Sequence, residues 1–235
     1  MVGEGWDSPI PPEMVESFQH LAREHRSIEV ELPRATGRPP SRLLIFCDAS
    51  KKAYGAVAYV MDDNLKRSLL CAKGKLTPLK RKQKIEIEPE QSKKKDKKQS
   101  IPRFELCAAV MGIELYDKLK ESPRLANLPC DIFSDSQVTL YRIINSKKLH
   151  SEIYVQNRLD RIFELMDDRV CWRFVSSENN PADSLTRGCD IDELAKDELW
   201  WNGPDMAVLQ EDQKAMRDYK PPPELFDGLG ETMEM

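Results

Sequence analysis

The sequence predicts an α/β fold in which helices flank a mixed five-stranded sheet. Two observations support this prediction. Alternating apolar and polar residues indicate three consecutive strands, and beyond a strongly charged stretch helical and strand-like patterns alternate along the chain. With 235 residues, of which 40% are hydrophobic, the chain can bury one core of roughly 160 residues and leave polar flanks.

The first three strands are expected at residues 42–50, 54–62 and 66–73. Turn-forming residues at 51–52 and 62–64 separate them. Because these connections are short, the three strands should form an antiparallel meander.

The next two elements complete the centre of the predicted sheet. Residues 102–120 have the period of an amphipathic helix, and residues 130–134 form a short apolar strand. That strand is buried enough to lie parallel to the first. The core-facing row of the helix is Leu106, Ala109, Val110, Ile113 and Leu115.

The remaining elements follow the same α/β alternation. We expect helices at about 136–145 and 151–167, a fifth strand at 169–176, and a last helix from about Pro181. Ahead of the sheet, a helix at 12–26 and an extended segment at 28–33 are expected.

These elements divide the chain into three parts. Residues 1–40 form an N-terminal segment, and residues 41–189 form the main domain, which contains a basic low-complexity loop at 78–100. Residues 190–235 form a C-terminal extension that begins with a Trp-Trp-x-Gly-Pro segment. Its acidic tail, from residue 205 onward, is expected to be disordered.

Charge is distributed unevenly along the chain. Residues 66–103 contain 14 Lys or Arg against four Asp or Glu, so this stretch carries +10 while the remainder carries −14. The loop at 78–100 has too few apolar residues to bury a core. It could gather phosphate, act as a nuclear-localisation-like tract, or be a solvated insertion without a role.

Several protein classes are disfavoured. No apolar run is long enough for a membrane helix, and the N-terminus lacks the basic and apolar regions of a secretory signal. The six cysteines are scattered without a CxxC pair, which favours buried reduced thiols over zinc ligands or disulfides. An intracellular protein, cytoplasmic or nuclear, is expected.

Four acidic residues are the candidate catalytic and metal-binding groups. Asp48 ends an apolar strand, Glu105 lies one turn into a helix, Asp135 follows a strand, and Asp183 lies near the start of a helix. Taken singly, each acid could start a turn, cap a helix or lie exposed. Taken together, clustered carboxylates repel one another unless cations neutralise them, and carboxylate oxygens suit two Mg²⁺ (or Mn²⁺) ions.

The sequence around these acids resembles the ribonuclease H domain of BEL/Pao-type LTR retrotransposons, the Pao retrotransposon family. Six short motifs occur in the same order as in that family, over roughly residues 42–204. They are residues 47–50 (Cys-Asp-Ala-Ser), 53–57 (Ala-Tyr-Gly-Ala-Val), 101–109 (Ile-Pro-Arg-Phe-Glu-Leu-Cys-Ala-Ala), 133–137 (Phe-Ser-Asp-Ser-Gln), 180–188 (Asn-Pro-Ala-Asp-Ser-Leu-Thr-Arg-Gly) and 199–204 (Leu-Trp-Trp-Asn-Gly-Pro).

The resemblance implies a ribonuclease H-like fold and two-metal hydrolysis of the RNA strand of RNA/DNA hybrids. By this resemblance Asp48 bridges both ions, Glu105 and Asp135 complete one ion's site, and Asp183 completes the other's. The products would carry 5′-phosphate and 3′-hydroxyl ends. The basic loop departs from the family, in which this junction is usually much shorter.

Six further residues are candidates for contacting the nucleic acid. Ser134, Ser136 and Gln137 lie close to the expected site, although Ser136 could equally cap the following helix. The other polar or aromatic candidates along the hybrid are Tyr54, Arg103 and Arg187.

The N-terminal residues indicate the origin of the chain and a candidate partner. Residues 6–33 resemble the connection that follows reverse transcriptase in these polyproteins, so the chain is expected to be an element fragment or a host-retained domain. A reverse transcriptase acting in trans is a candidate partner, and no membrane partner is expected.

Two other functions remain open. One is a nucleic-acid-binding relic with weak or no activity. The other is an aspartic peptidase, a label attached to the Pao family. Peptidases of that class need an Asp-Thr/Ser-Gly motif, and neither Asp48 nor Asp135 is followed by one.

Overall fold

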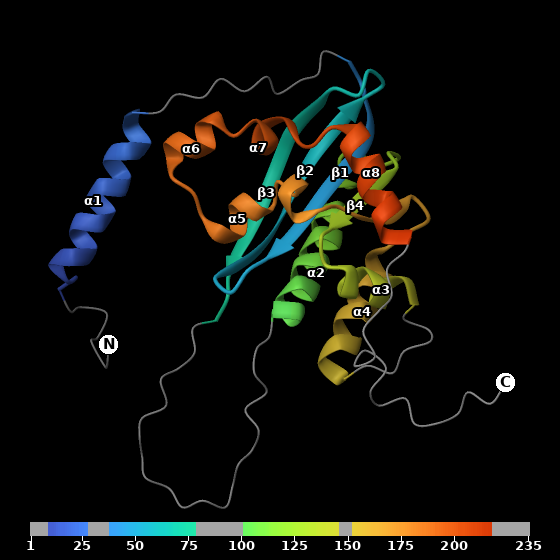
Figure 1. The fold of residues 1–235 in the computed structure, drawn as a ribbon, viewed down its shortest axis with the longest axis horizontal. Coiled ribbons are helices and arrows are strands. Elements are labelled where there is room, and N and C mark those ends of the chain that lie inside the picture. Colours follow the sequence, from blue (N-terminus) through green and yellow to red (C-terminus); the bar gives the residue numbers. More distant parts are fainter. Residues whose placement is uncertain (1–8, 28–37, 79–100, 146–151, 218–235) are drawn as a thin grey trace, which may run out of the picture. The chain divides into compact units, whose positions relative to one another are not determined.

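The computed structural model describes residues 9–27, 38–78, 101–145 and 152–217 (Figure 1). These residues belong to two compact units. One contains helix α1 (Pro12–Ser27), which confirms the helix predicted at 12–26, and the short helix α6 (Ile191–Lys196). The extended segment at 28–33 and nearly all of the basic loop lie outside the described residues.

The larger unit is built on a five-stranded sheet with the order β3-β2-β1-β4-β5. β1 is antiparallel to β2, β2 is antiparallel to β3, and β4 is parallel to both β1 and β5. The predicted mixed sheet is confirmed. Its strands are β1 (Pro40–Ala49), β2 (Ala53–Asp62), β3 (Arg67–Leu76), β4 (Cys130–Ser134) and β5 (Val170–Phe174).

One face of the sheet is covered by α2 (Ile101–Leu119) and α4 (Ile153–Leu165), which also pack on each other. Because side chains alternate along a strand, every second residue of β1 and β4 points to this face. Ile45 and Ile132 are fully buried there. The α2 helix confirms the prediction at 102–120 and anchors the main core.

The opposite face of the sheet has an aromatic core. The ring of Phe46 stacks on that of Phe133 with centroids 4.7 Å apart, and Tyr59 meets Phe46 edge-on at 5.7 Å. The Tyr59 hydroxyl donates a hydrogen bond to the carbonyl of Trp200, 2.6 Å away, in α7 (Glu198–Asn202). The first tryptophan of the Trp-Trp segment therefore holds the C-terminal extension onto β2.

Helix α8 (Met206–Arg217) covers the β5 edge of the sheet. The Gln213 amide accepts a hydrogen bond from the Phe174 N–H and donates one to the Phe174 carbonyl, and Asp212 accepts from the Ser176 N–H. These side chains hydrogen-bond backbone groups along β5, which as an edge strand has such groups available for pairing. The expected disorder is therefore wrong for residues 206–217, and residues 218–235 lie outside the described residues.

The six cysteines are all free thiols, as predicted. Their expected burial holds for Cys47 and Cys130, whereas Cys171 and Cys189 are exposed and Cys71 and Cys107 are intermediate. Within the described part of the chain, no helix is long and apolar enough to cross a membrane.

Gly112 sets the distance between α2 and the sheet. A Cβ at this position would collide with Sγ of Cys47 and lie 3.5 Å from Ile132. Only a residue without a side chain therefore allows α2 to lie this close to β1 and β4. The same approach brings Glu105 of α2 toward the end of β1.

We predict that Gly112→Ala lowers the free energy of unfolding by about 1–3 kcal/mol, the usual effect of overpacking a core. Alanine stabilises a helix by up to about 1 kcal/mol relative to glycine. A net loss of stability would therefore show that the collision with Cys47 outweighs this helix preference. Urea unfolding measures this change. Gly74→Ala is the matched control, since a Cβ there meets nothing within 4 Å.

Adding Cys47→Ala to Gly112→Ala should recover part of the loss because it removes the colliding sulfur. A Gly112→Ala protein as stable as the Gly74→Ala protein would contradict this account of the α2–sheet distance.

Candidate active site

The parallel pairing of β1 and β4 places Asp48 and Asp135 at the same edge of the sheet. Cys47 lies opposite Ser134 in this pair, and the two acids are the next residues on their strands. Ligand sites in open α/β sheets form beyond the carboxyl ends of such strands. Asp48 is only 7% exposed, and its carboxylate accepts a hydrogen bond from the hydroxyl of Thr186.

Glu105 reaches the site from α2, where it is the fifth residue. Its Oε2 accepts a hydrogen bond from the hydroxyl of Ser136 at 2.5 Å. The same Ser136 oxygen accepts from the Thr139 N–H at 3.2 Å, so Ser136 also caps helix α3 (Gln137–Asn145). One serine thus fixes both the start of α3 and the position of Glu105.

Asp183 begins the short helix α5 (Asp183–Arg187), and its Oδ1 pairs with Nε of Arg187 at 2.7 Å. Two bonds attach this region to β1 beside Asp48. The Asn180 amide, on a residue that is 1% exposed, donates to the Cys47 carbonyl at 3.0 Å, and the Ser50 hydroxyl donates to the Thr186 carbonyl at 2.7 Å.

Gly55 allows α5 to approach the sheet at the level of the acids. It lies opposite Asp48 in the β1–β2 pair. A Cβ there would lie 2.9 Å from the Lys73 carbonyl and 3.1 Å from Cδ1 of Leu185 in α5. Gly55 therefore leaves room for the helix that carries Asp183.

The pKa of Asp135 is strongly raised. Its pKa is raised to about 6, with burial as the largest cause, and a hydrogen bond from Ser177, 2.6 Å away, opposes the shift. The charges of Asp48 and Glu105 raise the pKa further. Carboxyls in such surroundings resist ionisation because no cation compensates the added charge.

Asp48 acts electrostatically on all three other acids. Burial raises the pKa of Glu105, Ser136 opposes this, and Asp48 raises it again. Burial and then Asp48 raise the pKa of Asp183, while Arg187 lowers it. Asp48 is therefore the acid whose charge affects each of the other three.

The donor set suits a hard divalent cation. All four groups are carboxylates, and three of them accept hydrogen bonds from neutral hydroxyls rather than from cations. Among the described residues, no group of three or more His, Cys, Asp or Glu side chains is arranged as a ready ligand set. Each carboxylate is instead turned to its own donor, as mutual repulsion without a cation favours.

The six nucleic-acid candidates have different surroundings. Ser134 and Ser136 are 3% and 7% exposed, and their hydroxyls bond inside the protein, which gives both a positioning role. Gln137 is half-buried at the start of α3. The Arg187 side chain is 67% exposed, although it pairs with Asp183.

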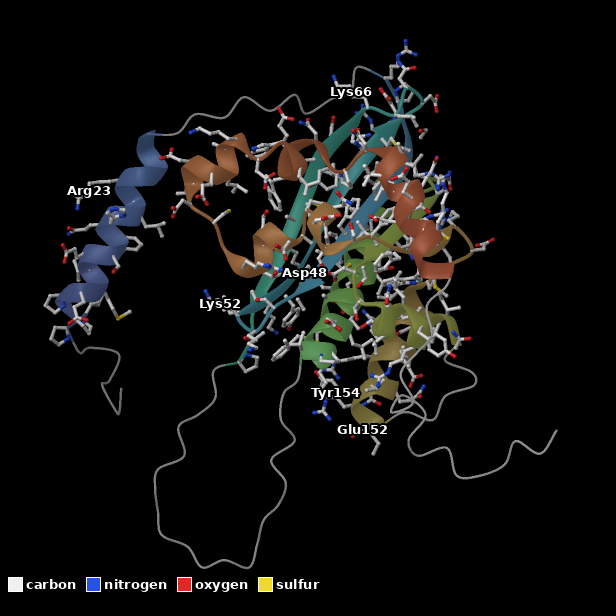
Figure 2. The ribbon with its side chains drawn as sticks, in the orientation of Figure 1. Arg23, Asp48, Lys52, Lys66, Glu152 and Tyr154 are labelled. Atoms are coloured by element: carbon white, nitrogen blue, oxygen red, sulfur yellow. The ribbon has the colours of Figure 1, made fainter. Side chains whose placement is uncertain are left out.

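Of the other two candidates, Arg103 lies in the first turn of α2, and Tyr54 lies on β2 against the same turn. The ring of Tyr54 stacks on that of Phe104, with centroids 6.4 Å apart. Arg103 pairs with Glu152 at 2.6 Å and lies over the ring of Tyr154, at the start of α4 (Figure 2).

Sequence reasoning missed four residues that position the acids: Ser50, Ser177, Asn180 and Thr186. Three of them fall within the motifs at 47–50 and 180–188 that carry the family resemblance. Their presence in those motifs could have indicated a role at the site, but their hydrogen-bond partners depend on tertiary contacts.

Residues 2–89 match the family model described as the Pao retrotransposon-like RNaseH-like domain. The predicted family resemblance is confirmed. The matched part contains Asp48 and Gly55 but ends before the other three acids, and its description as RNaseH-like agrees with the mixed five-stranded sheet.

Solved ribonuclease H structures are also similar, and no curated protein matches the sequence. The N-terminal RNase H domain of rv2228c from Mycobacterium tuberculosis is 13% identical over 66% of this chain and 97% of its own, with a TM-score of 0.43. RNase H1 from Halobacterium salinarum is 11% identical over 67% and 97%, with a TM-score of 0.39. LC11-RNase H1, solved in complex with an RNA/DNA hybrid, is 12% identical over 65% and 98%, with a TM-score of 0.42.

The raised pKa of Asp135 predicts a pH-dependent stability without metal. A carboxyl whose pKa is higher in the folded state stabilises that state while protonated, so its contribution is complete below the ordinary value of 3.8 and disappears as the pH rises through about 6. In EDTA, wild type should therefore lose on the order of 1–3 kcal/mol relative to Asp135→Asn between these values.

Urea unfolding across this pH range measures the difference. Asp160→Asn is the matched control, because Asp160 is an exposed acid on α4. The account would be wrong if Asp135→Asn showed the same pH dependence as wild type and the control.

Proposed function

We propose that this chain is a ribonuclease H-type endonuclease that hydrolyses the RNA strand of RNA/DNA hybrids with Mg²⁺ or Mn²⁺. One observation carries the proposal: Asp48 raises the pKa of acids from three other elements, at the carboxyl edge of two parallel strands. Such a concentration of carboxylates, in which Asp183 is paired with Arg187 and the other three accept hydrogen bonds from hydroxyls, is costly for the fold and suits a cation-dependent function.

The assignment of metal ligands follows the family resemblance and fits this geometry. Asp48 would be shared, Glu105 and Asp135 would hold one ion with it, and Asp183 would hold the other. When bound, two such ions would activate water and stabilise the leaving 3′-oxygen, the usual two-metal chemistry of phosphodiester hydrolysis.

The residues around the acids would keep them ready for cations. Ser136, Ser177 and Thr186 each donate a hydroxyl to a different carboxylate, which fixes its orientation without supplying positive charge. A carboxyl with a pKa of about 6, as at Asp135, is partly protonated near neutrality until a cation favours its ionised form.

The substrate class rests on the resemblance and on the surface beside the acids. A ribonuclease H must detect 2′-hydroxyls on one strand. Tyr54, Arg103, Gln137 and Arg187 are the side chains we assign to the hybrid, while Ser136 holds Glu105 in place and Ser134 accepts a hydrogen bond from the Ser136 N–H. A reverse transcriptase acting in trans would supply the hybrid.

A nucleic-acid-binding relic is the second candidate. The ion pair of Asp183 with Arg187 favours it, because the arginine neutralises a carboxylate that the enzyme would use for a metal. In an active enzyme Arg187, which is exposed, would have to turn away from Asp183.

The first test of the proposal concerns metal binding. Millimolar Mg²⁺ or Mn²⁺ should raise the melting temperature of wild type, because an ion that binds only the folded state stabilises it by mass action. Asp48→Asn should weaken this response most among the four acids, whereas Asp160→Asn should leave it unchanged. Differential scanning fluorimetry measures the shift, and a wild-type melting temperature indifferent to both ions would favour the relic.

The second test concerns the reaction. With Mg²⁺ or Mn²⁺, wild type should nick only the RNA strand of a labelled hybrid. Asp135→Asn should abolish nicking, with hybrid affinity equal or higher, because a repulsive carboxylate near the scissile phosphate is removed. Asp160→Asn should nick like wild type.

Gel analysis of the two labelled strands and a binding titration in EDTA provide the readouts. Equal cleavage of double-stranded DNA, or nicking that persists in Asp135→Asn, would contradict the proposed activity.

A further inference from the structure

A basic groove of about 440 Å³ lies between β3 and the α2–α4 pair. Lys73 and Lys75 of β3 line one side, Arg158 and Arg161 of α4 line the other, and Tyr54 of β2 lies between them. Tyr54 and Lys75 are directly opposite in the β2–β3 pair, so their side chains share the face of the sheet on which α2 packs.

Three of these cations lack carboxylate partners. Among the described residues, neither Lys73, Lys75 nor Arg158 forms an ion pair, and both lysines are exposed. Arg161 differs, because Glu114 at 3.6 Å and Glu164 at 2.8 Å compensate its charge. The groove therefore keeps a net positive charge on fixed structural elements, which suits a polyanion.

Arg158 is held in place by other means. Its guanidinium lies 3.4 Å from the ring centroid of Tyr154, its Nε donates to Sγ of Cys107 at 3.3 Å, and its Nη1 donates to the Tyr154 carbonyl at 3.0 Å. These contacts restrict the side chain without neutralising it. A positioned guanidinium of this kind favours a phosphate oxygen as its next partner.

Tyr54 links the groove to the residues next to two of the acids. Tyr54 is next to Gly55, which pairs with Asp48, and its ring stacks on Phe104, the residue before Glu105. A strand that leaves the acids toward α2 would therefore reach Tyr54 first and the two lysines next.

We propose that this groove binds a single-stranded continuation of the nucleic acid whose hybrid part lies at the acids. Cations that follow a backbone, combined with an aromatic side chain on which a base can stack, are the combination that recognises single strands. A duplex fits the groove less well, because its bases are stacked inside and cannot stack on Tyr54, which in a hybrid would reach only the sugars and the backbone. This inference deepens the proposed function and rests on it for the placement of the hybrid.

The experiment compares Lys73→Ala/Lys75→Ala with Lys66→Ala/Lys214→Ala, a control with the same change of charge. Lys66 and Lys214 are exposed, and Lys66 lies at the opposite end of the β2–β3 pair. Fluorescence anisotropy in EDTA measures binding to oligothymidine, to a blunt hybrid and to the same hybrid with an oligothymidine tail. Thermal melting verifies that both variants are folded.

If each lysine neutralises one phosphate, the double variant should bind oligothymidine about 25-fold more weakly at 0.1 M salt, and its log–log salt slope should fall by about 1.4. Wild type and the control should bind the tailed hybrid more tightly than the blunt one, whereas the double variant should lose that preference. A double variant indistinguishable from the control would overturn the proposal.

The two proposals fail separately. Oligothymidine binding that depends on Lys73 and Lys75, in a wild-type protein that never nicks a hybrid, would support the groove and reject the nuclease. Metal-dependent nicking with no effect of the two lysines on single-strand affinity would reject the groove and leave the nuclease standing.

Discussion

Repulsion among carboxylates at the end of the β1–β4 pair is the constraint on which the rest of the structure depends. Asp48 and Asp135 leave parallel strands side by side, and α2 and α5 bring Glu105 and Asp183 to the same place. Close packing makes this arrangement unavoidable, since Gly112 lets α2 approach β1 and Gly55 makes room for α5. The fold brings like charges together.

A buried acid outside the candidate site, Asp131, shows that this chain can supply arginine partners to a carboxylate. Asp131 of β4 has a side chain that is 4% exposed, and it pairs with Arg42 at 2.8 Å and with Arg173 at 2.7 Å. In the part of the chain that the structure describes, the side chains that donate to Asp48, Glu105 and Asp135 are the hydroxyls of Thr186, Ser136 and Ser177. The difference indicates that the missing positive charge at the acid site is left for cations.

Much of this fold could be predicted from the sequence, because it depends on short-range signals, whereas the four acids were selected with the help of the family resemblance and stay a prediction. Period-2 strands with short turns specify the meander, and a short apolar strand specifies β4 as parallel. The packing contacts could not be predicted in this way. Gln213 of α8 satisfies the backbone of Phe174, and Ser136 and Thr186 satisfy Glu105 and Asp48, through contacts between residues distant in sequence. An acidic, proline-containing tail therefore gave no sign that its first part would form a helix against β5.

The most direct test of the central claim is a crystal structure of the chain grown with Mn²⁺, with the ions located by their anomalous scattering. The account predicts two Mn²⁺ ions about 3.5–4 Å apart, with Asp48 bound to both and the other three acids divided between them. Absence of anomalous peaks among the four carboxylates, or an Asp183 that remains paired with Arg187 beside a single ion, would contradict it.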